Sequence, residues 1–177
     1  MTKPRPAVPT VPNSKPYTGF DGVAEGIGGG TAQWIIEARR TSEGVLWNNG
    51  AYGVRKVRGG RSMSVHSTGR AMDLSYMRHQ GKGIVKGRPR AEAWLDRVVA
   101  AANQLGVECV LDYWPAPYGR GWFCNVQRWN KYARKTISGA PGGQWFHIEL
   151  NPKMAFDARS VRQAFRDVFP EIPTERP

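Results

Sequence analysis

The sequence is poor in cysteine, histidine and acidic residues, and it has no long apolar run. Its 177 residues include 2 cysteines and 3 histidines. Two thiols are too few for a disulfide framework or a thiolate zinc cage, so we expect Cys109 and Cys124 to be free, with one disulfide between them as the alternative. No stretch of about 18 apolar residues occurs, so we expect no segment that spans a membrane.

The shortage of acidic residues leaves the chain strongly basic. It has 26 Lys and Arg against 14 Asp and Glu, a formal net charge of +12. Such a charge favours polyanionic partners, and nucleic acid, an anionic cell-wall polymer and a membrane surface all qualify. Basic and aromatic residues are interspersed within 118–135. Proteins that bind single-stranded nucleic acid use such residues to stack against the bases and to bind the phosphates. No nucleic-acid recognition motif accompanies them, so nucleic acid is the least favoured partner.

The chain is long enough for one domain with a real core. Residues 1–20 contain five prolines and are predicted to form a Pro-rich tail or linker. Residues 21–170 form the predicted domain, and 171–177 a short C-terminal tail. The first 20 residues lack the apolar centre of a secretory signal, so we expect no signal peptide.

Periodicity and turn residues predict a mixed architecture. Helices are expected over 31–40, 89–105 and 157–169, the last with Asp157 as its cap; strands over 107–114 and 144–150; a hairpin around an Asn-Gly turn over 44–57; and a long loop over 115–143. The predicted fold class is α+β, a small antiparallel sheet with flanking helices.

The three histidines are His66, His79 and His147. A hydrolytic zinc site needs about three nitrogen or oxygen ligands and one open position for water, whose pKa the ion lowers towards neutrality. His66 and Asp73 would supply two ligands. His147, on the predicted strand 144–150, would supply the third. His79 follows a polar stretch and is expected in a surface loop outside the site.

Five positions match the pattern S-x-H-x-x-G-x-A-x-D: Ser64, His66, Gly69, Ala71 and Asp73. In this the chain resembles the zinc D-Ala-D-Ala carboxypeptidases and L-Ala-D-Glu endopeptidases of bacteria and phages. The segment 144–147 is similar to their second motif, an acidic residue followed three positions later by histidine. The resemblance covers about residues 45–150 and implies a hedgehog/D-Ala-D-Ala-peptidase-like fold.

The resemblance also implies roles for individual residues. Zn²⁺ would be bound by His66, Asp73 and His147. An arginine ahead of the first motif would polarise the scissile carbonyl and stabilise its oxyanion; Arg55 matches best, with Arg58 and Arg61 as rivals.

Three further residues are expected to bind substrate: Ser64, Trp145 and Trp122. Trp122 belongs to the aromatic, basic loop 115–143, which would form one wall of a peptide groove. The alternative for the loop aromatics is that they fill a small core beneath the loop.

The sequence departs from the second motif at Gln144, where the family has the acidic general base. An amide cannot take that role. Three explanations remain open. The site is inactive; a substitute carboxylate serves, either Glu149, which faces the same side of the strand as His147, or Asp112; or zinc hydroxide alone supports slow turnover.

The resemblance and the charge together lead to one expected function and two alternatives. The expected function is a zinc metallopeptidase that hydrolyses stem peptides of bacterial peptidoglycan, such as a phage lysin held in the host cytoplasm until lysis or carried in the virion. Its partners would be peptidoglycan and anionic cell-wall polymers. The alternatives are a catalytically impaired zinc-containing wall-binding module and a basic nucleic-acid-binding protein.

Overall fold

The computed structural model describes residues 15–77, 87–135 and 141–172. One antiparallel sheet has the strand order β1-β2-β6-β3-β4-β5. Its strands are β1 (Trp47–Gly50), β2 (Ala71–Ser75), β3 (Val107–Asp112), β4 (Arg120–Phe123), β5 (Trp129–Lys131) and β6 (Trp145–Leu150). The helices are α1 (Gly29–Thr41), the 3₁₀ helix η1 (Val65–Thr68), α2 (Arg88–Ala100), α3 (Ala102–Leu105), α4 (Pro152–Phe156) and α5 (Ala158–Val168). The predicted α+β class is confirmed.

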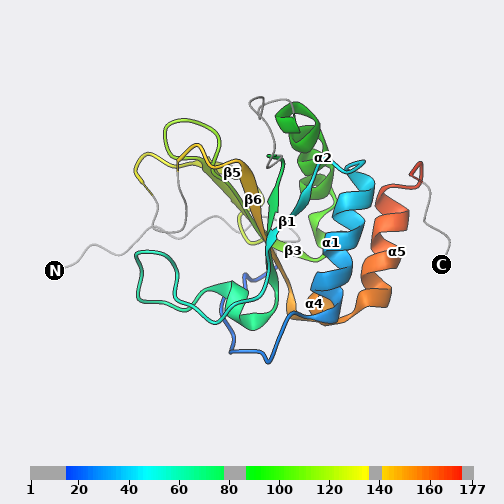
Figure 1. Cartoon of the computed structure of the whole chain (residues 1–177), viewed down its shortest axis with the longest axis horizontal. Helices are drawn as coiled ribbons and strands as arrows, with labels where there is room; N and C mark the ends of the chain where they lie inside the picture. Colours follow the sequence, from blue (N-terminus) through cyan, green and yellow to red (C-terminus); the bar gives the residue numbers. More distant parts are fainter. Residues whose placement is uncertain (1–14, 78–86, 136–140, 173–177) are drawn as a thin grey trace.

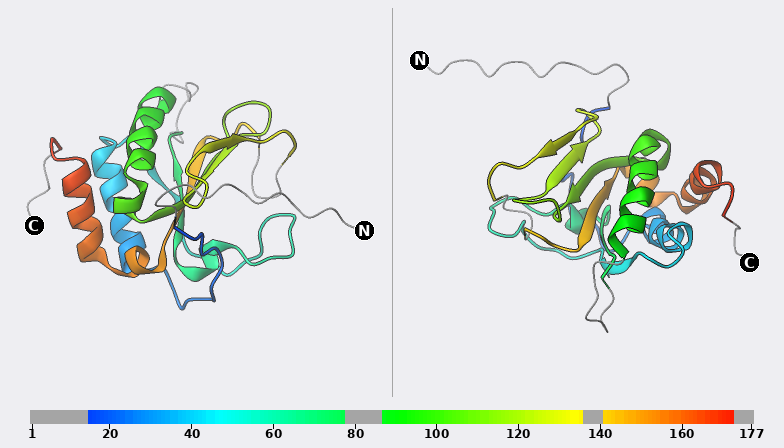
Figure 2. Two further views of the ribbon diagram at one scale, coloured as in Figure 1. Left: turned by 180° about the vertical axis from the view of Figure 1, so that it is seen from behind. Right: turned by 90° about the horizontal axis from the view of Figure 1, so that it is seen from above.

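The helices α1, α2 and α5 lie on one side of the sheet (Figures 1 and 2). Side chains alternate along each strand, so Met72, Phe146 and Val110 face these helices and are fully buried in the main core. The intervening residues Asp73 and His147 point to the other face, away from α1, α2 and α5 and towards His66 on η1. The pleat therefore separates the main core from a second face, on which Asp73 and His147 lie beside a smaller apolar cluster of Cys109, Leu111 and Tyr113.

Most of the predicted elements are confirmed. These are α1, which extends the predicted 31–40; α2 and α3, which divide the predicted 89–105; β3 and β6 within the predicted strands; and α5, which begins after its cap Asp157. The Asp157 side chain accepts a hydrogen bond from the Ser160 backbone N–H at 2.9 Å, as the sequence predicted.

The predicted hairpin over 44–57 is wrong. β1 pairs with β2 instead, and Trp47 lies opposite Ser75. The Asn48 side chain accepts a hydrogen bond from the Gly50 backbone N–H at 3.0 Å, which closes a local turn and not a strand-to-strand turn. After Gly50 the chain leaves the sheet. The turn signal was real, but the partner of β1 lies more than twenty residues further along the sequence.

The predicted loop over 115–143 contains the hairpin of β4 and β5, so this prediction is wrong in part. Trp122 lies opposite Val110, is 5% exposed and belongs to the core on the helical side of the sheet. Its expected place among the substrate-binding residues is therefore corrected. Asp112, on the same side of the sheet, is fully buried and accepts hydrogen bonds from Arg88 and Arg120. It is the acceptor of an ion-pair network and is removed as a substitute base.

Replacing Trp122 by alanine is expected to lower the free energy of unfolding by about 3–5 kcal/mol, because the change opens a cavity in a packed core. Trp145→Ala is the matched control. Trp145 is only partly buried, on the open face of the sheet, and the loss there is expected to be smaller. Urea denaturation of both variants gives the comparison; equal losses would contradict the placement of Trp122 in the core.

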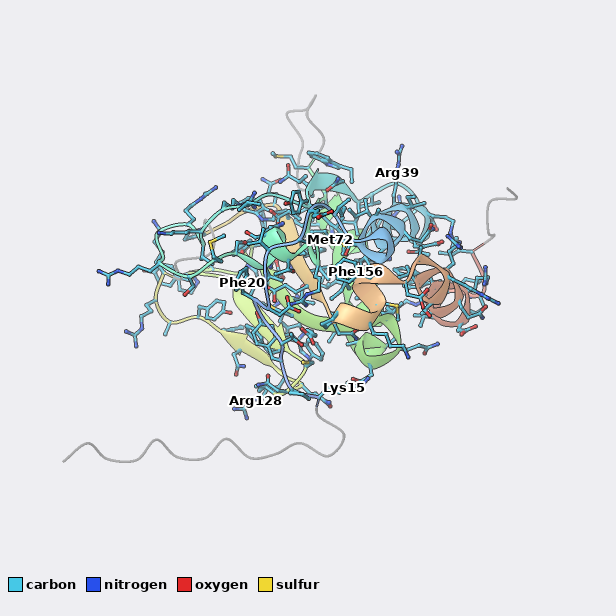
Figure 3. The ribbon with its side chains drawn as sticks, turned by 90° about the horizontal axis from the view of Figure 1, so that it is seen from below. Lys15, Phe20, Arg39, Met72, Arg128 and Phe156 are labelled. Carbon is cyan, nitrogen blue, oxygen red and sulfur yellow. The ribbon has the colours of Figure 1, made fainter. Side chains whose placement is uncertain are left out.

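Residues 15–22, here called the N-terminal strap, lie along the open face of the sheet although most of them fall in the predicted tail. Figure 3 shows the strap from below, running from Lys15 at the lower edge towards Phe20. The Thr18 hydroxyl donates to Glu108 at 2.6 Å, and the Tyr17 ring packs edge-on against Phe123 with centroids 5.2 Å apart. The folded body therefore begins before residue 20.

Candidate metal centre

Three side chains far apart in the sequence converge on the open face of the sheet. His66 lies on η1, Asp73 on β2 and His147 on β6, and one ligand atom from each lies within 4.8 Å of the others. Asp73 and His147 are directly opposite in the pairing of β2 with β6. The Asp73 Oδ1 atom is 3.0 Å from His147 Nδ1 and 3.4 Å from His66 Nε2. The three predicted ligands form a group that could hold a metal ion.

The remaining residues of the first motif shape the chain around His66. The Ser64 hydroxyl accepts a hydrogen bond from the His66 backbone N–H at 3.3 Å and caps η1. Gly69 ends η1 with φ at 71°, and a side chain there would collide with the Gly26 carbonyl. Ala71, opposite Glu149, is fully buried. Ser64 borders the cleft, but its hydroxyl is engaged in the cap, so its expected substrate-binding role gains no support.

Both histidines are oriented as metal ligands usually are. The Nδ1 atom of His66 contacts the Ala51 carbonyl, which leaves Nε2 free to face Asp73. The Nε2 atom of His147 lies 2.9 Å from Glu149 Oε1, which leaves Nδ1 beside Asp73. A ligating imidazole almost always donates its other N–H to a carbonyl or a carboxylate. The donor set of two imidazole nitrogens and one carboxylate oxygen suits zinc.

Charge coupling within the group is strong. Burial alone would lower the pKa of His147, but hydrogen bonds to Asp73 and Glu149 outweigh it and raise that pKa to about 10. Burial likewise opposes ionisation of Asp73 and Glu149, yet their contacts with His147 hold the pKa of each carboxyl below its usual value. Without a metal, the imidazole of His147 is therefore a cation between two carboxylates at neutral pH.

Metal binding is expected to displace this proton. The raised pKa of His147 stabilises the metal-free fold fully below about pH 6.5, and that stabilisation is lost as the pH rises through about 10. Since a metal needs the Nδ1 lone pair, zinc affinity should rise by up to about tenfold per pH unit between pH 7 and 9. Titration calorimetry in buffers of different ionisation enthalpy measures the released proton. An affinity that does not change with pH would contradict the coupling, and Glu149→Gln should reduce the slope.

An open cleft of about 830 Å³ lies over the three ligands. One part of its wall is aromatic, formed by Tyr17, Phe20, Tyr113, Phe123, Tyr132 and Trp145. Another part is basic, formed by Arg55, Lys56 and Arg58. The cleft can therefore admit water and a substrate with both apolar and anionic groups to the ligand atoms.

Only some of the other predicted site residues border the cleft. Arg55 and Arg58 border the cleft, so the geometry keeps both as candidates for the polarising cation, whereas Arg61 is not among the bordering residues. Trp145 borders the cleft as expected and packs against Tyr113 with ring centroids 5.2 Å apart. His79 lies outside the described residues.

Gln144 lies immediately before the first residue of β6. It is not among the residues that border the cleft. Its backbone carbonyl accepts hydrogen bonds from the Tyr76 N–H and the Ser75 hydroxyl. Its side-chain oxygen is buried and has no hydrogen-bond partner among the described residues. Gln144 is therefore held through its backbone carbonyl, while its side-chain oxygen has no partner among the described residues.

Among the described residues, Asp73 and Glu149 are the two carboxylates that border the cleft. Both oxygens of Glu149 are engaged, Oε1 with His147 and Oε2 with the Tyr17 hydroxyl at 2.6 Å. Glu149 therefore resembles a residue that orients a metal ligand more closely than it resembles a general base with a free oxygen. The sequence did not predict a role for Tyr17 in the site, because this residue lies in the proline-rich segment and belongs to neither motif.

Both thiols are free, as predicted. Cys109 borders the cleft but is 1% exposed, and burial raises the pKa of its thiol well above the usual value. Cys124 faces the core side of the sheet, and burial raises the pKa of its thiol to about 11. Neither thiol is activated as a nucleophile or a metal ligand.

Comparison of the chain with protein-family models, with curated proteins and with solved structures finds no match. Within residues 15–77, 87–135 and 141–172, no helix has the length and apolar character needed to cross a membrane.

Proposed function

We propose that this protein is a zinc-dependent peptidase that hydrolyses stem peptides of bacterial peptidoglycan. The observation that carries the proposal is the convergence of His66, Asp73 and His147 beneath an open cleft, with both imidazoles oriented by a second partner. The resemblance of segment 64–73 to the zinc D-Ala-D-Ala peptidases supports the choice of reaction. A hedgehog/D-Ala-D-Ala-peptidase-like fold is part of the same proposal.

The residues around the cleft divide the work of peptide hydrolysis. When bound, the ion would supply a polarised water of lowered pKa. Arg55 or Arg58 would stabilise the negative charge that develops on the carbonyl oxygen. Trp145 and the other aromatic side chains would hold the apolar parts of the peptide. Glu149 would keep the Nδ1 atom of His147 turned towards the site.

The charge of the chain supports an anionic environment as the place of action. A net charge of +12 would draw the protein to peptidoglycan and to anionic cell-wall polymers. A phage lysin, released from the host cytoplasm at lysis or carried in the virion, fits this chemistry by analogy. An L-Ala-D-Glu-type endopeptidase is preferred to a D,D-carboxypeptidase, because lysis requires that stems or cross-links be cut.

Gln144 favours a second candidate function, a zinc-containing wall-binding module with impaired catalysis. The amide cannot transfer the proton, and Glu149 is engaged with His147 and Tyr17. Such a protein would retain the cleft and the ion while turning over slowly or not at all.

Digestion of purified peptidoglycan by the zinc-loaded protein, with mass analysis of new amino termini, tests the proposal. New termini that vanish on chelation and return with zinc are the expected result. Co-sedimentation with the wall without new termini would support the wall-binding module. Steeply salt-dependent binding to DNA or RNA, without wall binding, would favour the nucleic-acid alternative and would contradict both the peptidase and the wall-binding module.

A further inference from the structure

We propose that Tyr17, in the N-terminal strap, is a positioning residue of the metal centre that acts through Glu149 on His147. The proposal rests on the proposed zinc site and extends it to a segment that precedes both motifs. The Tyr17 hydroxyl donates to Glu149 Oε2 at 2.6 Å, and Glu149 Oε1 lies 2.9 Å from His147 Nε2. On its other side, His147 presents Nδ1 to Asp73. A continuous chain of hydrogen bonds thus runs from the strap to the metal-binding atom.

The chemistry of these groups fixes the direction of each hydrogen bond. A carboxylate has no proton to give, so both oxygens of Glu149 accept. Tyr17 must then donate to one oxygen, and the Nε2–H of His147 to the other. Without a metal, Nδ1 holds a second proton against Asp73. Because the Nε2 proton is held by Glu149, the Nδ1 proton is the one that an ion displaces, and the Nδ1 lone pair then faces the site. Removing the Tyr17 hydroxyl would leave Glu149 Oε2 without its donor and the carboxylate freer to turn away from His147.

The strap is pinned at the residues that follow Tyr17, so its hydroxyl is held in place. Thr18 bonds Glu108 twice, through its hydroxyl at 2.6 Å and its backbone N–H at 3.3 Å. The buried Arg70 donates to Asp21 at 2.9 Å and to the Leu150 carbonyl at the end of β6. These bonds tie the strap to β3 directly and to the end of β6 through Arg70, the residue just ahead of β2. Support of this kind is what a precise site requires.

Packing accounts for the ring of Tyr17 but not for its hydroxyl. The ring contacts Phe123, which a phenylalanine would do equally well. Glu149 is only 6% exposed, so water has little access to its carboxylate. The Tyr17 hydroxyl therefore supplies a hydrogen bond that Glu149 would otherwise lack. Tyr17→Phe therefore isolates the hydroxyl. Tyr132→Phe is the matched control, since Tyr132 borders the same cleft with its hydroxyl against Gly121.

The test measures zinc affinity by competition with a chelator, and the absorption spectrum of the cobalt-substituted protein. Zinc affinity should fall about 10- to 100-fold in Glu149→Gln and about 3- to 10-fold in Tyr17→Phe. The double variant should match Glu149→Gln alone, because Tyr17 acts through Glu149. The cobalt spectrum should change in Tyr17→Phe and stay unchanged in Tyr132→Phe. Circular dichroism of each metal-free variant reports whether it is folded.

The outcomes separate this inference from the proposed function. If the wild type binds zinc and Tyr17→Phe binds it equally well with an unchanged cobalt spectrum, the role of Tyr17 is overturned alone. Additive losses in the double variant would also overturn it. A wild type that binds no zinc would overturn both proposals. If the expected pattern appears while peptidoglycan remains uncut, the role of Tyr17 is supported and the proposed substrate is rejected.

Discussion

His66→Ala is expected to abolish stoichiometric zinc binding, where the wild type holds one ion per chain. His66 is the one ligand that does not lie on the sheet, and its removal leaves only the facing pair Asp73 and His147. We expect zinc affinity to fall by more than about 100-fold, since losing a mere partner of a ligand costs 10- to 100-fold. Zinc should then no longer raise the unfolding temperature, a stabilisation worth about 2.7 kcal/mol at 100 times Kd in the wild type.

Metal analysis and thermal unfolding with and without zinc check this expectation. His79→Ala is the matched control, because the sequence predicts that His79 lies outside the site and its variant should keep the ion. Wild-type protein that is purified without chelator and contains no zinc would contradict the metal site. Equal loss of zinc in both variants would contradict the assignment of His66.

Gln144→Glu is expected to raise kcat on peptidoglycan fragments by about 10²- to 10⁴-fold, the usual value of general acid–base catalysis. The wild-type amide cannot accept a proton, whereas a carboxylate can once its side chain turns from the entry to β6 into the cleft, which Gln144 does not border. The Gln144 side-chain oxygen is buried and without a partner among the described residues.

Steady-state kinetics at saturating zinc measure this gain. Gln144→Leu serves as the control, because it is expected to keep the low activity of the wild type and its zinc content. If Gln144→Glu abolishes an activity that the wild type has, the proton is moved by another group. Glu149 is then the next candidate, since it and Asp73 are the carboxylates that border the cleft among the described residues.

The sequence predicted the parts of the structure that local rules control. The apolar spacing of residues 89–105 and the cap at Asp157 lead to helices whatever surrounds them. The three ligands were predicted from the resemblance of 64–73 and 144–147 to the two peptidase motifs, and the structure brings His66, Asp73 and His147 together. Alternation along β6 also placed Glu149 on the face of His147, where the structure has it.

Only the tertiary structure decided which distant segments meet. Strand pairing depends on long-range partners, so β1 joined β2 and not the residues after its own turn. Pairing of β4 with β3 placed Trp122 opposite Val110, which turned an expected substrate contact into core. The contact of Tyr17 with Glu149 joins residues 132 positions apart. No local pattern encodes such a contact, because it exists only once the sheet has formed and buried a carboxylate that needs a second donor.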